Sequence, residues 1–241
     1  MPAANSTITD FEITALSDRS VLVSFGNIIA EAINRKVLYL HKKLLQSAFN
    51  GFLESVPAYA SLAIFYDVVQ IKKHTQSPAF IFVKSYLQQL LLQINTDSEP
   101  AAEIIKIPVC YDAVFGMDIE HLAESHQLKI SEVISLHSSV IYRVYMIGFM
   151  PGFAYMGTVN EKLIAPRKHQ PRLNIPAGSV GIAGSQTGIY PVASPGGWQI
   201  IGRTPLQLFN VNSSTPCLLS AGDQVQFASI DKNEFEQLHG Y

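Results

Sequence analysis

The sequence predicts a small α+β domain, a small sheet with two helices, followed by a mainly β domain built as a barrel or a sandwich. Two observations predict this architecture. In the first part of the chain, short β-type segments alternate with two segments whose apolar residues recur at helical spacing. Between residues 148 and 209, glycine and proline recur every few residues, which favours short strands joined by tight turns. We therefore expect one domain over residues 1–98 and a second over 99–241.

In the first domain, the elements are expected in the order strand, strand, helix, strand, helix. Residues 11–25 read as two short strands, and Asn27 is placed to cap the helix that follows. The next strand covers 61–67, residues 70–78 read as a polar loop, and a second amphipathic helix begins near Pro78. This order indicates a sandwich with both helices on one face of the sheet.

A strand is expected over residues 103–111, which either completes the sheet of the first domain or opens the second; the sequence does not decide between the two. Asp118 is a candidate N-cap for a short helix, and residues 131–137 form a second one. Residues 140–149 alternate between apolar and polar positions, as a strand does. The many short strands of the glycine- and proline-rich window after it indicate an all-β barrel or sandwich.

Composition excludes several classes of function. With 17 Lys and Arg against 19 Asp and Glu and no long basic run, the chain has no electrostatic footprint for nucleic acid. Its N-terminus lacks the basic and apolar regions of a signal peptide, and no apolar run approaches the roughly 20 residues of a membrane span. The two cysteines, Cys110 and Cys217, are most simply reduced thiols. We expect a cytoplasmic protein without a membrane or nucleic-acid partner.

Known catalytic and cofactor motifs are missing. The glycine-rich segment GSVGIAGSQTG has neither the GK[ST] of a phosphate loop nor GxGxxG spacing. The chain has no HExxH or paired CxxC motif for zinc and no GxSxG nucleophile elbow. We expect no metal site and no autonomous nucleotide site.

Arginines in the glycine- and proline-rich window are the strongest candidates for an anion site. Arg167 and Arg172 lie on one proline-stiffened loop, where two guanidinium groups could clamp a carboxylate or phosphate. Alternatively, they pair with surface carboxylates or carbonyls. Arg203 could join this site or extend to the rim of the barrel.

Other polar residues of the second domain could contribute to a site. Gln186 and Tyr190 lie in GSQTGIYP, where glycines would let a ligand approach the backbone; the alternative is a strand corner whose glycines serve only backbone angles. His137, at the end of a helix, has a pKa range suited to acid–base chemistry, although a satisfied helix-end histidine fits the spacing better.

Aromatic and methionine residues suggest a docking surface. Phe149, Met150 and Phe153 lie in the turn-rich segment GFMPGFAYMG, and Trp198 is the chain's one tryptophan. Such residues are enriched in protein interfaces, and they are equally suited to a core. The sequence does not separate these two interpretations.

The same segments resemble a known family. GFMPGFAYMG, PRKHQPRLNIPAGSVGIAG and QTGIYPVASPGGWQIIGRTPLQLF are similar to the signature of the KipI/PxpB family, whose members are labelled as the B component of 5-oxoprolinase, kinase A inhibitor or allophanate hydrolase subunit 1. The similarity is dense over residues 137–209 and looser in the N-terminal half. It implies a small α+β domain followed by a cyclophilin-like β-barrel.

The resemblance also implies an activity and partners. It implies a subunit of an ATP-dependent 5-oxoprolinase, inactive alone, that opens 5-oxo-L-proline to L-glutamate with KipA/PxpC-like and LamB/YcsF-like subunits. ATP with Mg²⁺ would be used by the complex, at a site shared with or supplied by a partner. The alternatives are a regulatory protein that inhibits autophosphorylation of a sensor histidine kinase, and a subunit that processes urea or allophanate.

Within this hypothesis, each candidate residue has a role that its side-chain chemistry allows. The three arginines, Arg167, Arg172 and Arg203, would hold the substrate carboxylate or the transferring phosphoryl group. His137 or Tyr190 would move a proton, and Gln186 would orient the lactam. Phe149, Met150, Phe153 and Trp198 would dock a partner.

Overall fold

The computed structural model describes residues 11–94 and 103–238, which belong to two compact units, Met1–Pro100 and Ala101–Tyr241. The boundary predicted after residue 98 lies outside the described residues. Each unit has its own hydrophobic core.

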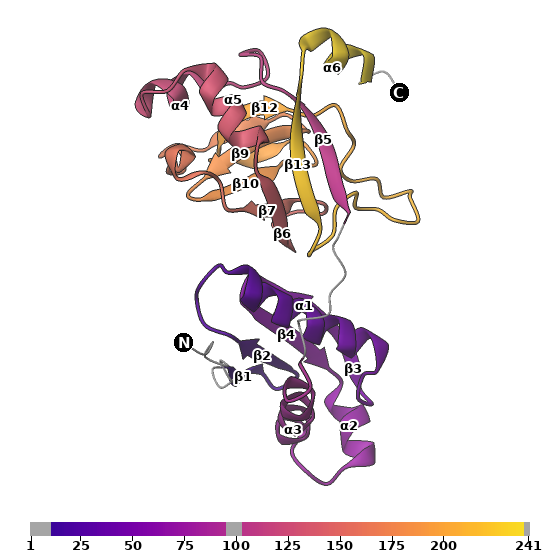
Figure 1. Cartoon of the computed structure of the whole chain (residues 1–241). Helices are drawn as coiled ribbons and strands as arrows, with labels where there is room; N and C mark the ends of the chain where they lie inside the picture. The colour runs from indigo at the N-terminus through magenta and orange to yellow at the C-terminus, as the bar shows by residue number, and fades with distance from the viewer. Residues whose placement is uncertain (1–10, 95–102, 239–241) are drawn as a thin grey trace, which may run out of the picture. The chain divides into compact units, whose positions relative to one another are not determined.

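Within residues 11–94, four strands form an antiparallel sheet in the order β1-β2-β4-β3 (Figure 1). The elements are β1 (Glu12–Ser17), β2 (Ser20–Ser24), α1 (Glu31–Gln46), β3 (Phe52–Pro57), β4 (Ser61–Tyr66), α2 (Val68–His74) and α3 (Ala79–Leu91). Alternate residues of β2 and β4 are buried on one face, and the apolar stripes of α1 and α3 pack into the same core. The predicted α+β class is confirmed for this unit.

Three local expectations for this unit were wrong. The α1 helix begins after Ala30, so Asn27 does not cap it. Strand β3 was not predicted, and residues 70–78 are not all loop, because α2 covers Val68–His74. The overlooked signal for α2 is Asp67, whose carboxylate accepts hydrogen bonds from the backbone N–H groups of Val69 and Gln70.

Among residues 103–238, seven strands close into a barrel in the order β10-β7-β6-β13-β5-β12-β9 (Figure 1). The elements are β5 (Ile104–Cys110), α4 (Ile119–Ser125), α5 (Ile130–Ser138), β6 (Ile141–Ile147), β7 (Ala154–Gly157), a 3₁₀ turn (Glu161–Leu163), β8 (Arg172–Ile175), β9 (Ser179–Ala183), β10 (Gln186–Ile189), β11 (Ser194–Gly196), β12 (Gln199–Arg203), β13 (Gln224–Ile230) and α6 (Lys232–Leu238). Strands β5 and β13 pair in parallel, and the other barrel pairs are antiparallel. The closed barrel confirms one of the two predicted architectures.

A two-stranded ribbon, β8 with β11, lies outside this barrel sheet. Side chains near the ribbon and on β9 and β12 form a second, smaller core, separate from the barrel interior. Its buried members are Phe153, Ile175, Ala183, Tyr190, Trp198 and Ile200.

Glycine creates room for the aromatic rings of this second core. Gly181 on β9 and Gly188 on β10 are directly opposite each other in the sheet. A Cβ atom on Gly181 would lie 3.0 Å from the Cβ of Trp198, and one on Gly188 would lie 3.1 Å from the ring of Phe153. These two glycines therefore let Trp198 and Phe153 approach the strands closely.

Candidate functional site

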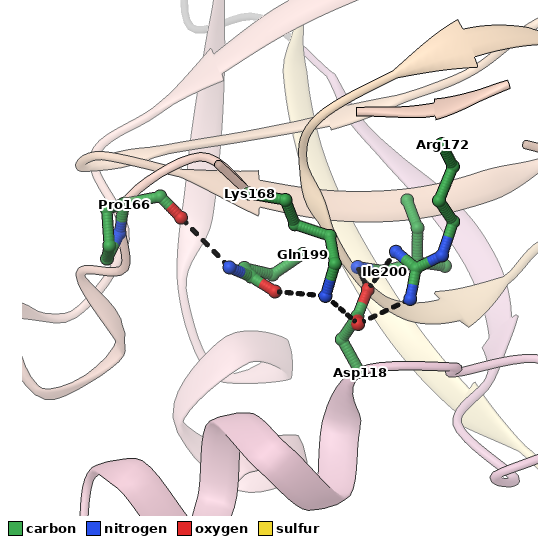
Figure 2. A network of polar contacts seen from close by, with 6 residues as sticks. All are labelled: Asp118, Pro166, Lys168, Arg172, Gln199 and Ile200. Carbon is green, nitrogen blue, oxygen red and sulfur yellow. Dashed lines mark hydrogen bonds and ion pairs between the residues drawn. The ribbon is translucent and has the colours of Figure 1, made fainter. Parts of the chain in front are cut away.

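The segment from Pro166 to Arg172, here called the arginine loop, is attached to the barrel unit through one buried carboxylate, that of Asp118 (Figure 2). Oδ1 of Asp118 accepts hydrogen bonds from Nζ of Lys168 at 2.7 Å and from a terminal nitrogen of Arg172 at 2.6 Å. Oδ2 accepts from the other terminal nitrogen of Arg172 and from the backbone N–H of Ile200, both at 2.7 Å. Arg172 thus makes a bidentate, charge-assisted contact, the strongest class of side-chain hydrogen bond.

Asp118 stands at the N-cap position of α4, as predicted, but its side chain makes no capping hydrogen bond. Its backbone instead pairs with β12, since its N–H donates to the carbonyl of Ile200 at 2.8 Å. Gly116 permits this approach, because a Cβ there would lie 2.5 Å from the carbonyl oxygen of Ile201. The aspartate therefore links the loop to a strand and leaves the helix uncapped.

The pKa of Asp118 reflects this environment. Burial alone would raise the pKa, but hydrogen bonds from Arg172, Lys168 and the Ile200 N–H outweigh it and lower the pKa below its usual value. The same contact raises the pKa of Arg172. Asp118 and Arg172 are therefore both ionised at neutral pH.

Two further hydrogen bonds fix the loop around Arg167. The side-chain amide of Gln199 donates to the carbonyl of Pro166 at 3.0 Å, and the backbone N–H of Lys168 donates to the carbonyl of Gly197 at 2.7 Å. Both chain neighbours of Arg167 are thereby held. Within the described part of the chain, the Arg167 guanidinium itself makes no hydrogen bond or ion pair, and it is exposed.

Arg167 lines a cavity of about 230 Å³ beside the ribbon. Half of its ten lining residues are aromatic: Phe149, Phe153, Tyr155, Tyr190 and Trp198. The remaining lining residues are Pro171, Pro195, Gly196 and Gly197. The ring of Phe153 packs edge-on against Tyr190 at 5.1 Å and against Trp198 at 5.4 Å between centroids, so the wall is a fixed aromatic cluster.

Gly196 shapes the wall of this cavity. A Cβ atom on Gly196 would lie 2.4 Å from the Tyr190 hydroxyl oxygen and 2.7 Å from Cδ1 of Ile175, so no larger residue fits without movement. At Gly197 the nearest atom to such a Cβ would be 3.6 Å away, an ordinary contact. Packing therefore requires glycine at position 196, whereas position 197 has room for a larger residue.

Comparison with known proteins identifies the family. Residues 11–219 match the family described as carboxyltransferase domain, subdomain C and D. The chain belongs to this family.

Relatives within and around the family show how far the similarity extends. The chain is 43% identical over 234 residues to the Bacillus subtilis protein named as the B component of 5-oxoprolinase, covering 96% of each. The crystal structure of TTHA0988 superposes with a TM-score of 0.77 at 35% identity over 88% of this chain, which spans only 40% of that longer chain. The crystal structure of Kluyveromyces lactis urea carboxylase matches with a TM-score of 0.74 at 20% identity, and the match covers 94% of this chain and 22% of that one. At this identity the match shows only that the two share a fold.

The arginines of the family signature do not form the predicted clamp. Arg172 is turned onto Asp118, whereas Arg167 lines the aromatic cavity. Arg203 lines a different, wider cavity of about 560 Å³, donates to the carbonyl of Ala177 at 2.7 Å and lies over the ring of Phe235. Arg172 pairs with a carboxylate, which was the alternative to the clamp. Of the three arginines, only Arg167 has a guanidinium without a hydrogen-bond partner among the described residues.

His137 lies inside the barrel, which argues against the predicted proton transfer. It is fully buried, and its ring nitrogens are hydrogen-bonded to the Tyr111 hydroxyl at 2.8 Å and the Thr187 hydroxyl at 2.9 Å. Its ring also stacks on Phe227. Burial lowers the pKa of His137 to about 3, so the imidazole is neutral at physiological pH and serves to connect α5 to the barrel strands.

Tyr190 lies where a ligand could reach it, because its ring lines the aromatic cavity. Burial raises its pKa and that of Tyr155, and the positive charge of Arg167 partly offsets the increase in both. Both phenols are therefore protonated at neutral pH and suited to donating a hydrogen bond. Gln186 begins β10 opposite Gly157, outside the set of residues that line the cavity.

The four expected docking residues differ in exposure. Phe149 is 64% exposed and Met150 half-buried, whereas Phe153 and Trp198 are buried in the second core. The four do not make one exposed docking surface, because two of them are packed against the strand glycines. Phe149 adopts a φ of 69°, an unusual conformation for an aromatic residue, at the edge of the cavity.

Sequence reasoning missed three contributors to the site: Asp118 as a partner of arginine, Lys168, and Tyr155. Asp118 and Arg172 are 54 positions apart, and no local pattern predicts that they meet. Over residues 11–94 and 103–238, no cluster of three or more His, Cys, Asp or Glu side chains could hold a metal ion. In the same residues, no helix combines the length and apolar character of a membrane span.

Proposed function

We propose that this chain is one component of an ATP-dependent 5-oxoprolinase, which opens the lactam ring of 5-oxo-L-proline to give L-glutamate. The supporting observation is the 43% identity to the Bacillus subtilis B component of 5-oxoprolinase over 96% of both chains. At this identity and coverage, the two proteins share both units and the complete signature region, so a shared role follows more readily than a shared fold alone.

The charge of the arginine loop supports an anionic substrate. Its charged side chains are Arg167, Lys168 and Arg172, and their one carboxylate partner among the described residues is Asp118. Lys168 and Arg172 share this one buried carboxylate, and Arg167 pairs with no carboxylate of the described residues, so the loop carries an excess of two positive charges. Both 5-oxoproline, through its carboxylate, and a phosphoryl group would be attracted to such a loop.

Further subunits complete the activity in this proposal. The sequence has no phosphate-loop motif, and no group of carboxylates or histidines in the described residues is arranged for a metal ion. A KipA/PxpC-like and a LamB/YcsF-like subunit would therefore hold ATP and Mg²⁺, and this chain would be inactive alone. ATP supplies the driving force for ring opening, while this chain binds and orients the substrate.

The residue roles in this proposal follow the geometry. Arg167 holds the substrate carboxylate, and Tyr190, protonated at neutral pH, donates a hydrogen bond. Lys168 and Arg172 act through Asp118 and position the loop. His137 has no part in proton transfer, and Arg203, at a separate cavity, has no contact with the same ligand.

The proposal is tested by reconstitution. This protein would be mixed with the two partner subunits, and glutamate release from 5-oxo-L-proline and ATP would be measured, with each component omitted in turn. Activity that requires this chain is the expected result. A well-formed complex that releases no glutamate would contradict the proposal and favour the regulatory alternative, which an autophosphorylation assay with a sensor histidine kinase would then examine.

A further inference from the structure

We propose that the aromatic cavity beside the ribbon is a binding site for the five-membered ring and carboxylate of 5-oxo-L-proline, formed by this chain alone, with Arg167 binding the carboxylate. This inference deepens the proposed function and rests on it for the identity of the ligand. The nature of the site, a small ring-shaped carboxylate receptor, rests on the cavity itself.

The guanidinium of Arg167, unlike those of its charged neighbours, is available for a ligand. Arg172, five positions further along, donates hydrogen bonds from both terminal guanidinium nitrogens to Asp118, and Lys168 donates to the same carboxylate. The backbone on each side of Arg167 is fixed through Pro166 and Lys168, yet its own guanidinium has no hydrogen-bond or ion-pair partner in the described chain. An exposed guanidinium without a partner, carried on a backbone that is fixed on both sides, is available to take a carboxylate in a bidentate contact.

The size of the cavity and the chemistry of its wall suit a small cyclic carboxylate. Drug-sized ligands occupy pockets of roughly 300–1,000 Å³, so a cavity of about 230 Å³ suits a smaller molecule. Aromatic faces and the rings of Pro171 and Pro195 offer apolar contact to the methylene groups of a saturated five-membered ring. The cavity thus provides apolar walls with one cationic group, the complement of a cyclic carboxylate.

The aromatic side chains of the wall are held in place by their neighbours. Trp198, Phe153 and Tyr190 are held by edge-to-face packing and by the two strand glycines behind them. Phe149, although largely exposed, also packs edge-on against Phe153, with 5.6 Å between the ring centroids. Binding therefore requires little reordering of side chains, which lowers its entropic cost.

The test uses the only tryptophan of the chain as a reporter. Because Trp198 lines the cavity, its single indole N–H signal in a ¹H–¹⁵N NMR spectrum should shift as 5-oxo-L-proline is added to the full-length protein without partners. Replacing Arg167 by Ala should weaken binding at least tenfold, and Arg167→Lys should give an intermediate affinity because lysine lacks the planar fork. Arg19→Ala, at an exposed arginine of the N-terminal unit, is the matched control and should leave binding unchanged.

A second ligand separates recognition of the ring from recognition of the carboxylate. The compound 2-pyrrolidinone has the lactam ring without the carboxylate, so it should bind more weakly than 5-oxo-L-proline and should be insensitive to Arg167→Ala. Equal binding of both compounds to the unaltered protein would overturn the role of Arg167.

The outcomes distinguish this inference from the proposed function. Absence of a saturable, Arg167-dependent shift in the isolated chain would overturn the inference, even if the reconstituted complex released glutamate. Saturable binding together with an inactive complex would support the inference and contradict the proposed function. Binding of 5-oxo-L-proline that shifts Trp198 equally in the Arg167→Ala variant would place the carboxylate elsewhere and would also overturn it.

Discussion

Two arginines on one loop, Arg172 and Arg167, have opposite environments. Arg172 is one-quarter exposed and makes a bidentate contact with a carboxylate that is 3% exposed. Arg167 is exposed, lines an aromatic cavity and has no carboxylate partner among the described residues. The difference shows that a guanidinium in a signature motif can be structural or available for a ligand, and that its partner decides which.

The contacts of Arg172 with Asp118 explain why Arg167 can remain without a partner. Asp118 joins Lys168 and Arg172 to the N–H of Ile200, so the end of the loop is attached to β12. A bidentate contact fixes orientation as well as distance. The arginine loop can therefore present Arg167 at the cavity without using that residue for its own stability. Substitutions in the two environments should accordingly affect different properties.

The largest effect on stability is expected for Asp118→Asn. The substitution removes the negative charge and places an NH₂ donor against the donors of Arg172 and Lys168, which remain 25% and 26% exposed. Removing one partner of a buried pair costs about 3–5 kcal/mol, and partial exposure of the cations favours the lower end, about 3 kcal/mol. Urea unfolding followed by Trp198 fluorescence measures this loss in the barrel unit.

Glu120→Gln is the matched control for Asp118→Asn, because Glu120 is an exposed acidic residue in the adjoining helix α4. It should change the free energy of unfolding by less than about 0.5 kcal/mol. If Asp118→Asn changed the free energy of unfolding as little as this control, the contacts of Asp118 with Lys168 and Arg172 would not stabilise the loop. Acid should produce the same loss in the wild-type protein, since the folded pKa of Asp118 is depressed and its contribution disappears as pH falls through that pKa.

The next largest effect on stability is expected for a substitution in the wall of the aromatic cavity. In Gly196→Ala, the added methyl would lie 2.4 Å from the Tyr190 hydroxyl, so the aromatic cluster must shift. Overpacking of this kind costs about 1–3 kcal/mol. Gly197→Ala, whose methyl meets no atom closer than 3.6 Å, is the neighbouring control. Equal midpoints in urea unfolding for the two variants would mean that the close contact at Gly196 is relieved without cost.

The buried imidazole of His137, whose hydrogen-bond partners lie outside the arginine loop, makes a separate prediction for the dependence of stability on pH. The neutral His137 has a folded pKa of about 3 against an ordinary value of 6.5, so the unfolded chain binds a proton that the folded chain excludes. Stability should therefore be full above pH 6.5 and fall as pH decreases, by at most about 1.4 kcal/mol per pH unit. His137→Gln, which keeps hydrogen-bonding groups without titrating, should reduce this slope between pH 6 and 4. An unchanged slope would assign the acid sensitivity to other groups.

Local patterns were sufficient to predict the fold classes of the two units. Dense glycine and proline between residues 148 and 209 exclude long helices, and the closed barrel is consistent with that. The helix α2 and the strand β3 were missed because short elements carry too few apolar positions to show a period. Glycines such as Gly188 were read as turn residues or ligand approaches, whereas the structure uses Gly188 for the ring of Phe153.

Sequence reasoning found the arginine loop but not the distinction within it. Residue type and spacing treat Arg167 and Arg172 alike, and only the position of Asp118, more than 50 positions earlier, separates them. For His137, the spacing favoured a satisfied helix-end histidine over a proton-transfer group, but not its partners, the Tyr111 and Thr187 hydroxyls, which lie 26 and 50 positions away. Long-range partners are set by topology, which single-sequence patterns do not contain.

The smallest effect on stability, and the most direct test of the comparison, is expected for Arg167→Ala. Because this guanidinium is exposed and has no ion-pair partner among the described residues, its removal should change the free energy of unfolding by less than about 0.5 kcal/mol. In the reconstituted complex, the same substitution should lower kcat/KM for 5-oxo-L-proline at least tenfold, since a charge-assisted bidentate contact is lost. Arg172→Ala should instead lower the free energy of unfolding clearly, because it breaks the contact with Asp118. Its effect on kcat/KM should be indirect, through the position of the arginine loop. A destabilised Arg167→Ala protein with normal kcat/KM would make the open arginine structural, and the contrast between the two residues would disappear.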